Sequence, residues 1–358
     1  MGEQTITNTI DTKEVKTEKS NQRSCWVDTA KAFGIFLVFL GHTWYLSDFK
    51  LLNQMIYSFH VLAFFILSGY VIRRRQEKGG FLKFVWKKVK RLLIPAALCI
   101  IIALPFYFKS LENETTIDII KTIFFWEGLV AYNSPVWFLI VMFEAAIIER
   151  ILKIKDQKLY IKILYFIVFL VAGFFAYKFR YKIFIPFGFN KLLLCLAFLI
   201  LGMLLRELID VLKKNKKTMN IFLITTFVVS LGLWVLFGVV LNPKTAIYTF
   251  YVGNYWYFCL SGLFGSAWFF ILCYGISILT KKFEILGRET VCILGTHYIF
   301  VMYLHGWGFK FKIAYTWIYD IVAIAYTVIV ITLTILAVIL YRKLKNKVIK
   351  KIKQKETV

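Results

Sequence analysis

Residues 26–75 read WVDTAKAFGIFLVFLGHTWYLSDFKLLNQMIYSFHVLAFFILSGYVIRRR, which is two apolar segments joined by a short turn. Each segment is apolar enough to insert into a membrane, and each carries a histidine, His42 in the first and His60 in the second. An ionisable side chain inside a bilayer is costly, so its presence there indicates a functional site by default. This stretch therefore predicts both the fold class and the place where chemistry should be sought.

The rest of the chain has the same apolar character. Hydrophobic residues make up 59% of its 358 residues, and the mean hydropathy is +0.69. They gather in runs of about 17–25 residues, the length that crosses a hydrocarbon core about 30 Å thick. The sequence therefore predicts an all-α fold, a polytopic transmembrane helix bundle of about ten spans. The expected spans are about 29–48, 53–73, 92–108, 135–152, 159–178, 188–206, 219–241, 256–279, 287–306 and 315–341.

The charge distribution predicts how the chain lies in the membrane. The net charge is +25, which in a soluble protein would suggest binding to nucleic acid. Here most of the 45 lysines and arginines lie on every second connection between apolar runs, as the positive-inside rule requires. We therefore expect both termini to be cytoplasmic, the lipid bilayer to be a partner and nucleic acid not to be one.

The same pattern defines the domain organisation. We expect a disordered, polar cytoplasmic tail at 1–25, one transmembrane domain at 26–342 and a basic cytoplasmic tail at 343–358. No apolar segment precedes Trp26, so the first span is expected to be its own insertion signal. The six cysteines lie in or beside apolar segments without CxxC spacing, so they are expected to pack as small apolar residues. The sequence therefore predicts neither a disulfide framework nor a metal site.

The two histidines are expected at similar depth. His42 lies about six residues below the outer end of the first span, and His60 about seven below that of the second. At 1.5 Å per residue both rings lie roughly 10 Å deep, although helix rotation decides whether they face one cavity. Neutral imidazole is well suited to take a proton from a hydroxyl near neutral pH. The chain has no Gly-x-Ser-x-Gly motif, so the hydroxyl is expected to belong to a substrate.

Two further polar features accompany these histidines. Asp28 and Lys31 lie 14 and 11 residues before His42, which returns both to within about 40° of its helical face. They either line a route along the helix or anchor its end as N-cap and snorkelling lysine. His297 is a third histidine inside a span.

The connection after the second span is strongly basic. Arg73 opens a run of three arginines, and FLKFVWKKVKRLLIP at 81–95 reads as a basic amphipathic helix. Lys88 and Arg91 are spaced i, i+3 and share a face. Such a cluster binds an anionic lipid or a phosphate-rich cytoplasmic ligand, or it anchors the helix at the membrane surface. On the outer side, the loop at 109–135 carries acidic and aromatic residues that either contact a sugar or lie at the interface: Glu112, Glu114, Asp118, Trp126, Glu127 and Tyr132.

Five motifs in order resemble the acyltransferase-3 family of membrane proteins. They are the Asp28–Lys31–His42 spacing, YSFHVLAFFILSGY at 57–70, KKVKRLLIP at 87–95, SPVWFLIVMF at 134–143 and LGRETVCILGTH at 286–297. Within the family the chain is most similar to the fucose 4-O-acetylase-like subgroup. It departs from the family pattern at Lys31, where many members have arginine, at Thr290, where serine is usual, and at Leu294, where tyrosine is usual. Its basic pair, Lys88 and Arg91, is Lys-Arg instead of Arg-Arg.

The resemblance implies a membrane O-acyltransferase, most simply an O-acetyltransferase. Acetyl-CoA or another acyl-CoA would be the cytoplasmic donor substrate, and no bound cofactor is expected. The acceptor would be a hydroxyl of a cell-envelope or capsular polysaccharide, or of its lipid-linked precursor, at a bacterial plasma membrane. By this resemblance His42 is the catalytic base. Arg73, Lys88 and Arg91 would bind the donor, and Asp28, Lys31, His60, Trp137 and His297 would line the site.

Two other functions are compatible with the same residues. A polar stripe along a span also suits a transporter or flippase that moves a glycan or lipid without acyl transfer. A non-catalytic membrane receptor is the third possibility. Whether an acyl group would pass directly to the acceptor or through a relay also stays open, because the donor is expected inside and His42 toward the outside.

Overall fold

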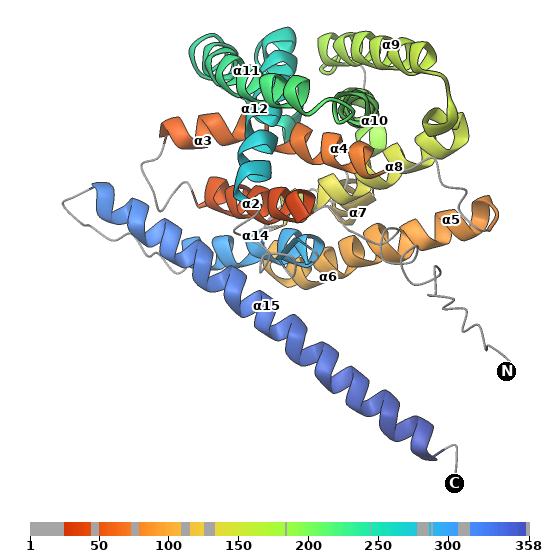
Figure 1. Ribbon diagram of the computed structural model, residues 1–358. Coiled ribbons are helices and arrows are strands. Elements are labelled where there is room, and N and C mark those ends of the chain that lie inside the picture. Colours follow the sequence, from red (N-terminus) through yellow and green to blue (C-terminus); the bar gives the residue numbers. More distant parts are fainter. Residues whose placement is uncertain are drawn as a thin grey trace, which may run out of the picture.

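The computed structural model forms a bundle of helices with one long helix lying across it (Figure 1). It describes residues 25–43, 50–72, 79–108, 115–124, 133–182, 185–243, 245–277, 286–287, 289–306 and 316–355. This part of the chain is 88% helical and contains no strand. The all-α membrane bundle predicted from the apolar runs is therefore confirmed.

Within those ranges, seven helical segments are long and apolar enough to cross a membrane. They comprise α2, α9, α10, α11, α12, α15 and a segment at 51–71 made of α3 and α4. Three further helices, α6, α8 and α14, occupy expected spans but are shorter than 18 residues. The total of ten spans and the cytoplasmic termini stay predictions. The helices are α2 Cys25–His42, α3 Lys50–Tyr57, α4 His60–Val71, α5 Phe81–Lys88, α6 Ile94–Phe108, α7 Thr116–Phe124, α8 Trp137–Leu152, α9 Leu159–Lys178, α10 Phe189–Leu212, α11 Lys216–Val235, α12 Tyr255–Ile276, α14 Thr290–Gly306 and α15 Thr316–Lys355.

The helix of the second expected span is interrupted in the middle, and the sequence does not predict this interruption. α3 ends at Tyr57 and α4 begins at His60, with Phe59 at φ −142°. The indole Nε1 of Trp234 donates to Ser58 Oγ at 2.8 Å, and Ser261 Oγ donates to the Ser58 carbonyl at 2.9 Å. A side-chain donor from α12 thus satisfies a backbone carbonyl at the break, and a donor from α11 satisfies the Ser58 hydroxyl.

A matching irregularity in the seventh span faces this break. Residues Leu236–Val240 form a π-helical turn after α11, and Gln54 Nε2 donates to the Val239 carbonyl at 2.6 Å. Gly238 approaches Ser58 so closely that a Cβ there would lie 2.8 Å from its hydroxyl oxygen. The two irregular segments therefore support each other inside the bundle.

The core of the bundle is built from α2, α4 and α10. In α2, 61% of residues are buried, whereas the share is 17% in α9 and α11 and 22% in α15. The three outer helices therefore present most of their apolar surface outward, as lipid-facing helices do. α4 and α10 approach closely because each has a glycine where they cross, Gly69 and Gly202.

The basic segment after the second span is helical as expected. α5 leads through the π-helical turn Val89–Leu93 into α6. Phe84 is the buried residue of α5, and Lys88 and Arg150 both lie over its ring. α5 is therefore fastened beside the C-terminal end of α8.

The long helix α15 contacts α2 and α14 and then extends away from the bundle (Figure 1). Arg342 pairs with the buried Glu289 at 2.5 Å, just before α14 begins. Because α15 continues to Lys355, the residues expected as the basic tail at 343–358 are helical up to that point. The expected tail at 1–25 lies outside the described residues except for Cys25.

The loop at 109–135 contains the short helix α7, which the sequence did not predict. Thr115 receives the backbone N–H of Asp118 and donates its hydroxyl to that carboxylate at 2.6 Å, an arrangement that caps the helix. The other acidic and aromatic residues singled out in this loop, Glu112, Glu114, Trp126, Glu127 and Tyr132, lie outside the described residues.

Gly202→Ala is expected to destabilise the protein. The added Cβ would lie 2.8 Å from the carbonyl carbon of Ile66 and 2.9 Å from the backbone nitrogen of Tyr70, which forces α4 and α10 apart. Overpacking of this kind costs about 1–3 kcal/mol. Thermal unfolding of the purified protein should show a lower Tm than wild type.

Gly232→Ala is the matched control, because this helical glycine of α11 has open space around its Cβ position. Alanine is favoured over glycine in a helix by about 1 kcal/mol, so its Tm should equal or exceed the wild-type value. If both variants unfold at the same temperature, the close crossing of α4 and α10 does not limit stability.

Candidate active site

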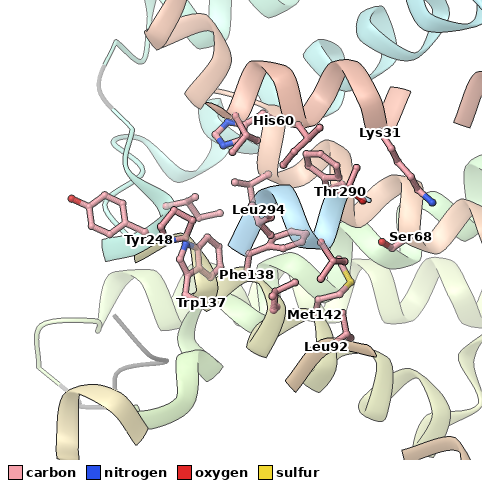
Figure 2. Close-up of a pocket in the computed structure, with 18 of the residues that line it drawn as sticks. Lys31, His60, Ser68, Leu92, Trp137, Phe138, Met142, Tyr248, Thr290 and Leu294 are labelled. Atoms are coloured by element: carbon pink, nitrogen blue, oxygen red, sulfur yellow. The ribbon is translucent and has the colours of Figure 1, made fainter. Parts of the chain in front are cut away.

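A cavity of about 640 Å³ lies between α2, α4, α8 and α14 (Figure 2). Six of the residues singled out from the sequence line it: Lys31, His42, His60, Lys88, Arg91 and Trp137. They come from segments far apart in the chain, so their convergence is a property of the fold. The volume is in the range of small-molecule binding sites, which is about 300–1,000 Å³.

The cavity has two chemically different ends. Figure 2 shows Lys31, Ser68 and Thr290 at one end and Trp137 and Tyr248 at the other. Lys31 precedes His42 by 11 residues on α2, so about 16 Å of helix separates the cationic end from the histidine.

Lys88 and Arg91 belong to the cationic end. Lys88 lies over Phe84 near Arg150, at the C-terminal end of α8, whereas Trp137 begins that helix. Arg91 is exposed and Lys88 is half-buried. The two side chains therefore connect the cavity with its surroundings at that end.

His42 lies against an aromatic and imidazole cluster. Its Nδ1 lies 3.1 Å from Tyr57 Oη, and the same hydroxyl lies 3.4 Å from the Gly41 carbonyl. A phenol that donates to Gly41 accepts from Nδ1–H, which leaves the lone pair of His42 on Nε2. The Tyr298 ring packs edge-on to His42 with centroids 5.1 Å apart. Tyr57 can thus set the orientation and the tautomer of His42.

His60 has a fixed tautomer. Its Nδ1 lies 2.7 Å from the carbonyl oxygen of Ile56, the residue four positions earlier and just before the break. A carbonyl oxygen only accepts, so Nδ1 carries the hydrogen and the lone pair of the neutral ring is on Nε2. The Tyr57 ring lies between the two imidazoles, 5.8 Å from His42 and 5.3 Å from His60 between centroids. The cavity therefore holds two imidazoles that share one tyrosine.

His297 lies behind His42 and does not line the cavity. Its ring centroid is 5.2 Å from that of His42, and its Nδ1 is 2.8 Å from the Leu294 carbonyl. Its Nε2 is buried and has no hydrogen-bond partner among the described residues. The Phe39 ring also packs against His297, with centroids 5.4 Å apart.

Asp28 is also outside the cavity lining, although it was expected to share the stripe of Lys31. The segment before α14 covers it: a Cβ on Gly287 would lie 2.9 Å from the Cα of Asp28. Helical periodicity predicts that Asp28 shares the face of α2 that carries Lys31 and His42. In the folded protein, the segment that contains Gly287 packs against Asp28 instead. Arg73, the third residue expected to bind the donor, lies outside the described residues.

Several residues of the site carry no signal in the sequence. Tyr57, Ser134, Tyr248 and Tyr298 line the cavity. Tyr57 and Ser134 begin the motifs at 57–70 and 134–143 but were not singled out, and Tyr248 and Tyr298 lie in none of the five motifs. Asn133 is buried and donates to the carbonyls of Cys99 and Gly295, which ties the start of α8 to α6 and α14. These two hydrogen bonds hold Ser134 and Trp137 at the cavity wall.

The side chains that are present favour acid–base chemistry on a bound substrate. No cysteine is among the described residues that line the cavity; its hydroxyl groups are those of Ser68, Ser134, Thr290 and the tyrosines. The described residues also contain no cluster of three or more potential metal ligands. Histidine bases at one place and cations at another suit the transfer of a group from an anionic donor.

Comparison with known proteins identifies the family. The acyltransferase domain of the acyltransferase-3 family matches residues 25–342, which is most of the chain, so the chain belongs to this family. The fold and the family together define it as a membrane acyltransferase. No curated protein and no solved structure matches the chain. Similarity to the fucose 4-O-acetylase-like subgroup stays a prediction.

Tyr57→Phe is expected to lower the turnover number roughly 10- to 100-fold, because it removes the oxygen that orients His42 but keeps the ring between the imidazoles. The KM for the acyl donor should stay near the wild-type value. Both constants follow from an acyl-transfer assay on the purified membrane protein.

Tyr326→Phe is the matched control, since its hydroxyl donates to the Phe300 carbonyl and its side chain does not line the cavity. It should turn over at the wild-type rate. If Tyr57→Phe also turns over at the wild-type rate, the Tyr57 hydroxyl has no role in catalysis.

Proposed function

We propose that the protein is an O-acyltransferase, most simply an O-acetyltransferase, that moves an acyl group from cytoplasmic acyl-CoA to a hydroxyl of a cell-envelope glycan or its lipid-linked precursor. The observation that carries the proposal is one cavity with cations at one end and two imidazoles toward the other. This arrangement matches a long anionic donor that has its reactive group at its far end.

The cationic end suits the phosphate groups of the donor. Lys31, Lys88 and Arg91 all line it, and Arg91 can bind a phosphate through a bidentate contact. The volume of the cavity accommodates an acylated pantetheine arm, with the nucleotide held outside at the cationic end. The roughly 16 Å between Lys31 and His42 is then spanned by the arm.

One continuous cavity favours direct transfer over a relay. The cations and His42 line the same space, so the thioester can reach the histidine without a second carrier. No cysteine among the described lining residues offers itself as an acyl carrier. The proposed reaction is therefore a single acyl transfer in a ternary complex.

The proposed step uses His42 as general base. Its Nε2 takes the proton of the acceptor hydroxyl while the hydroxyl oxygen attacks the thioester carbonyl carbon. The tetrahedral intermediate collapses with cleavage of the C–S bond, and the imidazolium returns the proton to the departing sulfur. The products are an O-acyl ester and free CoA. Tyr57 accepts from Nδ1–H throughout, which keeps the ring in the orientation and tautomer needed, as a triad partner does.

The lone pair on His60 has a supporting role in this scheme. His60 lines the same cavity, and the Ile56 carbonyl prevents its Nδ1 from acting as the base. Its Nε2 is suited to accept a hydrogen bond from a second hydroxyl of the acceptor and so to orient the acceptor before attack. His42 remains the proposed general base, with the Tyr57 hydroxyl as the partner of its Nδ1.

His42→Ala is expected to lower acyl transfer by at least roughly 100-fold, because it removes the general base. The measurement is transfer of label from acetyl-CoA in purified membranes, with thermal unfolding as the check that the variant is folded. If wild type and His42→Ala transfer label equally, the catalytic assignment fails. Glycan or lipid flux through the wild type without any acyl donor would instead support the transport function.

A Lys88→Gln, Arg91→Gln double variant is expected to raise the KM for acyl-CoA roughly tenfold or more, since it removes charge-assisted bonds to phosphate. Turnover at saturating donor should change little, and high salt should reduce the difference. Initial rates at varied acyl-CoA concentration measure both constants.

Lys90→Gln is the control from the same turn. Lys90 lies over the exposed Trp86 ring and does not line the cavity, so its donor KM should be that of wild type. An equal rise in all variants would mean that general surface charge, and not the cavity, holds the donor.

A further inference from the structure

Lys191, the third residue of α10, is buried almost completely although it is a lysine. Its side chain is 2% exposed and is not part of the cavity lining. Burying an ammonium group is costly unless other groups replace its water. Burial of Lys191 therefore lowers the stability of the fold unless its contacts compensate, which suggests that the residue has a role in positioning its neighbours.

Lys191 joins two residues that do line the cavity. Its Nζ donates to the Tyr248 carbonyl at 2.6 Å and lies 4.8 Å from the ring centroid of Trp137. Because Lys191 is outside the lining, it supports Trp137 and Tyr248 from behind. A cation over an indole ring is attracted by the negative face of the ring, and more strongly when the cation is desolvated.

The loop that carries Tyr248 is built as a rigid unit. Ala246 and Tyr251 exchange backbone hydrogen bonds at 2.6 and 3.1 Å. Asn242 closes its base by donating to the Val252 carbonyl and accepting from the Asn254 N–H. Phe250 is buried, and Tyr177 of α9 holds Gly253 through a 2.5 Å bond. Tyr248 itself remains 43% exposed, so the loop fixes its backbone and leaves its ring available.

Trp137 and Tyr248 stand at the end of the cavity opposite Lys31 (Figure 2). Hydrogen-bonding groups line the cavity as well: Ser134, which lies three residues before Trp137 in the chain, and His42 with Tyr298 packed against it. Aromatic faces carry partial negative charge and attract the polarised C–H groups of a flat saturated ring, while hydroxyls at the ring edge need donors and acceptors. A pyranose ring presents both kinds of surface.

We propose that Trp137 and Tyr248 form the subsite for a pyranose ring of the acceptor, and that Lys191 is the positioning residue that holds the two aromatic side chains in place. Identifying this end as the acceptor side rests on the proposed function, because the cations assign the other end to the donor. The ring would stack on Tyr248 with one hydroxyl directed toward His42.

Sugar binding can be tested without acyl transfer. The protein is placed in lipid nanodiscs free of glycoside detergent, and saturation-transfer difference NMR is recorded with a panel of methyl pyranosides. The open-chain polyol sorbitol is the compound control, because it has the hydroxyls but no ring face. At least one methyl pyranoside should receive saturation at its ring C–H protons, and sorbitol should receive none.

Tyr248→Ala and Lys191→Met should each lower this signal roughly fivefold or more, and Lys191→Arg should restore most of it by keeping the cation over Trp137. Lys158→Met is the matched control, since this lysine lies over Tyr160, away from the cavity lining. Binding of acetyl-CoA should be equal in all four variants, which a general folding defect would not allow.

Three results would overturn the subsite. They are the absence of saturation for every methyl pyranoside with the wild type, equal signals for sorbitol and the pyranosides, and undiminished binding by Tyr248→Ala. Failure of the proposed function has a different signature: the pyranosides bind at Trp137 and Tyr248, but no acyl group is transferred. Trp137 and Tyr248 would then still form a sugar-binding site, but that site could no longer be assigned to the acceptor of an acyl transfer.

Discussion

The break between Tyr57 and His60 is the feature on which the site depends. Inside a membrane no water replaces a lost backbone hydrogen bond, so a broken helix needs partners from its neighbours. Ser261 donates to the Ser58 carbonyl, Trp234 donates to the Ser58 hydroxyl, and the π-helical turn at Leu236–Val240 packs against the same point. The Ile56 carbonyl, at the end of the first half, is taken up by the imidazole of His60. One local irregularity therefore fixes the tautomer of His60 and places Tyr57 beside His42.

The cavity that results has a direction. Cations are gathered where α2 begins and α8 ends, and imidazoles and aromatic rings lie toward the opposite ends of those helices. A long donor with phosphates at one end and a thioester at the other matches that direction, and so does an acceptor that enters from the far side. Membership in the acyltransferase-3 family establishes the class of reaction, and the layout of the cavity suggests how two substrates could meet at His42.

The helical fold and several residues of the cavity could be predicted from the sequence, because polar residues are rare within membrane-spanning segments. An apolar run with a histidine in it stands out, so His42 and His60 were found without any knowledge of their contacts, and α9 begins and ends where its apolar run predicted. Lys88 and Arg91 are singled out by their spacing and line the cavity, and their binding of a donor stays a prediction. The break after Tyr57 is not predictable from the sequence, since neither Ser58 nor Phe59 is a helix breaker. The contacts that stabilise the break come from α11 and α12. Asp28 was assigned to the site by helical periodicity, which cannot foresee that Gly287 would cover it. Tyr248 and Lys191 depend on a folded loop, and loops carry no periodic signal.

The most direct test of this account is a cryo-EM structure of the protein in nanodiscs with a non-hydrolysable thioether analogue of acetyl-CoA. We expect density for the diphosphate against Lys88 and Arg91 and density for the acyl end beside His42, with the pantetheine arm filling the cavity between them. An analogue bound outside this cavity, or one whose acyl end stays at Lys31 and leaves the space around His42 empty, would contradict it.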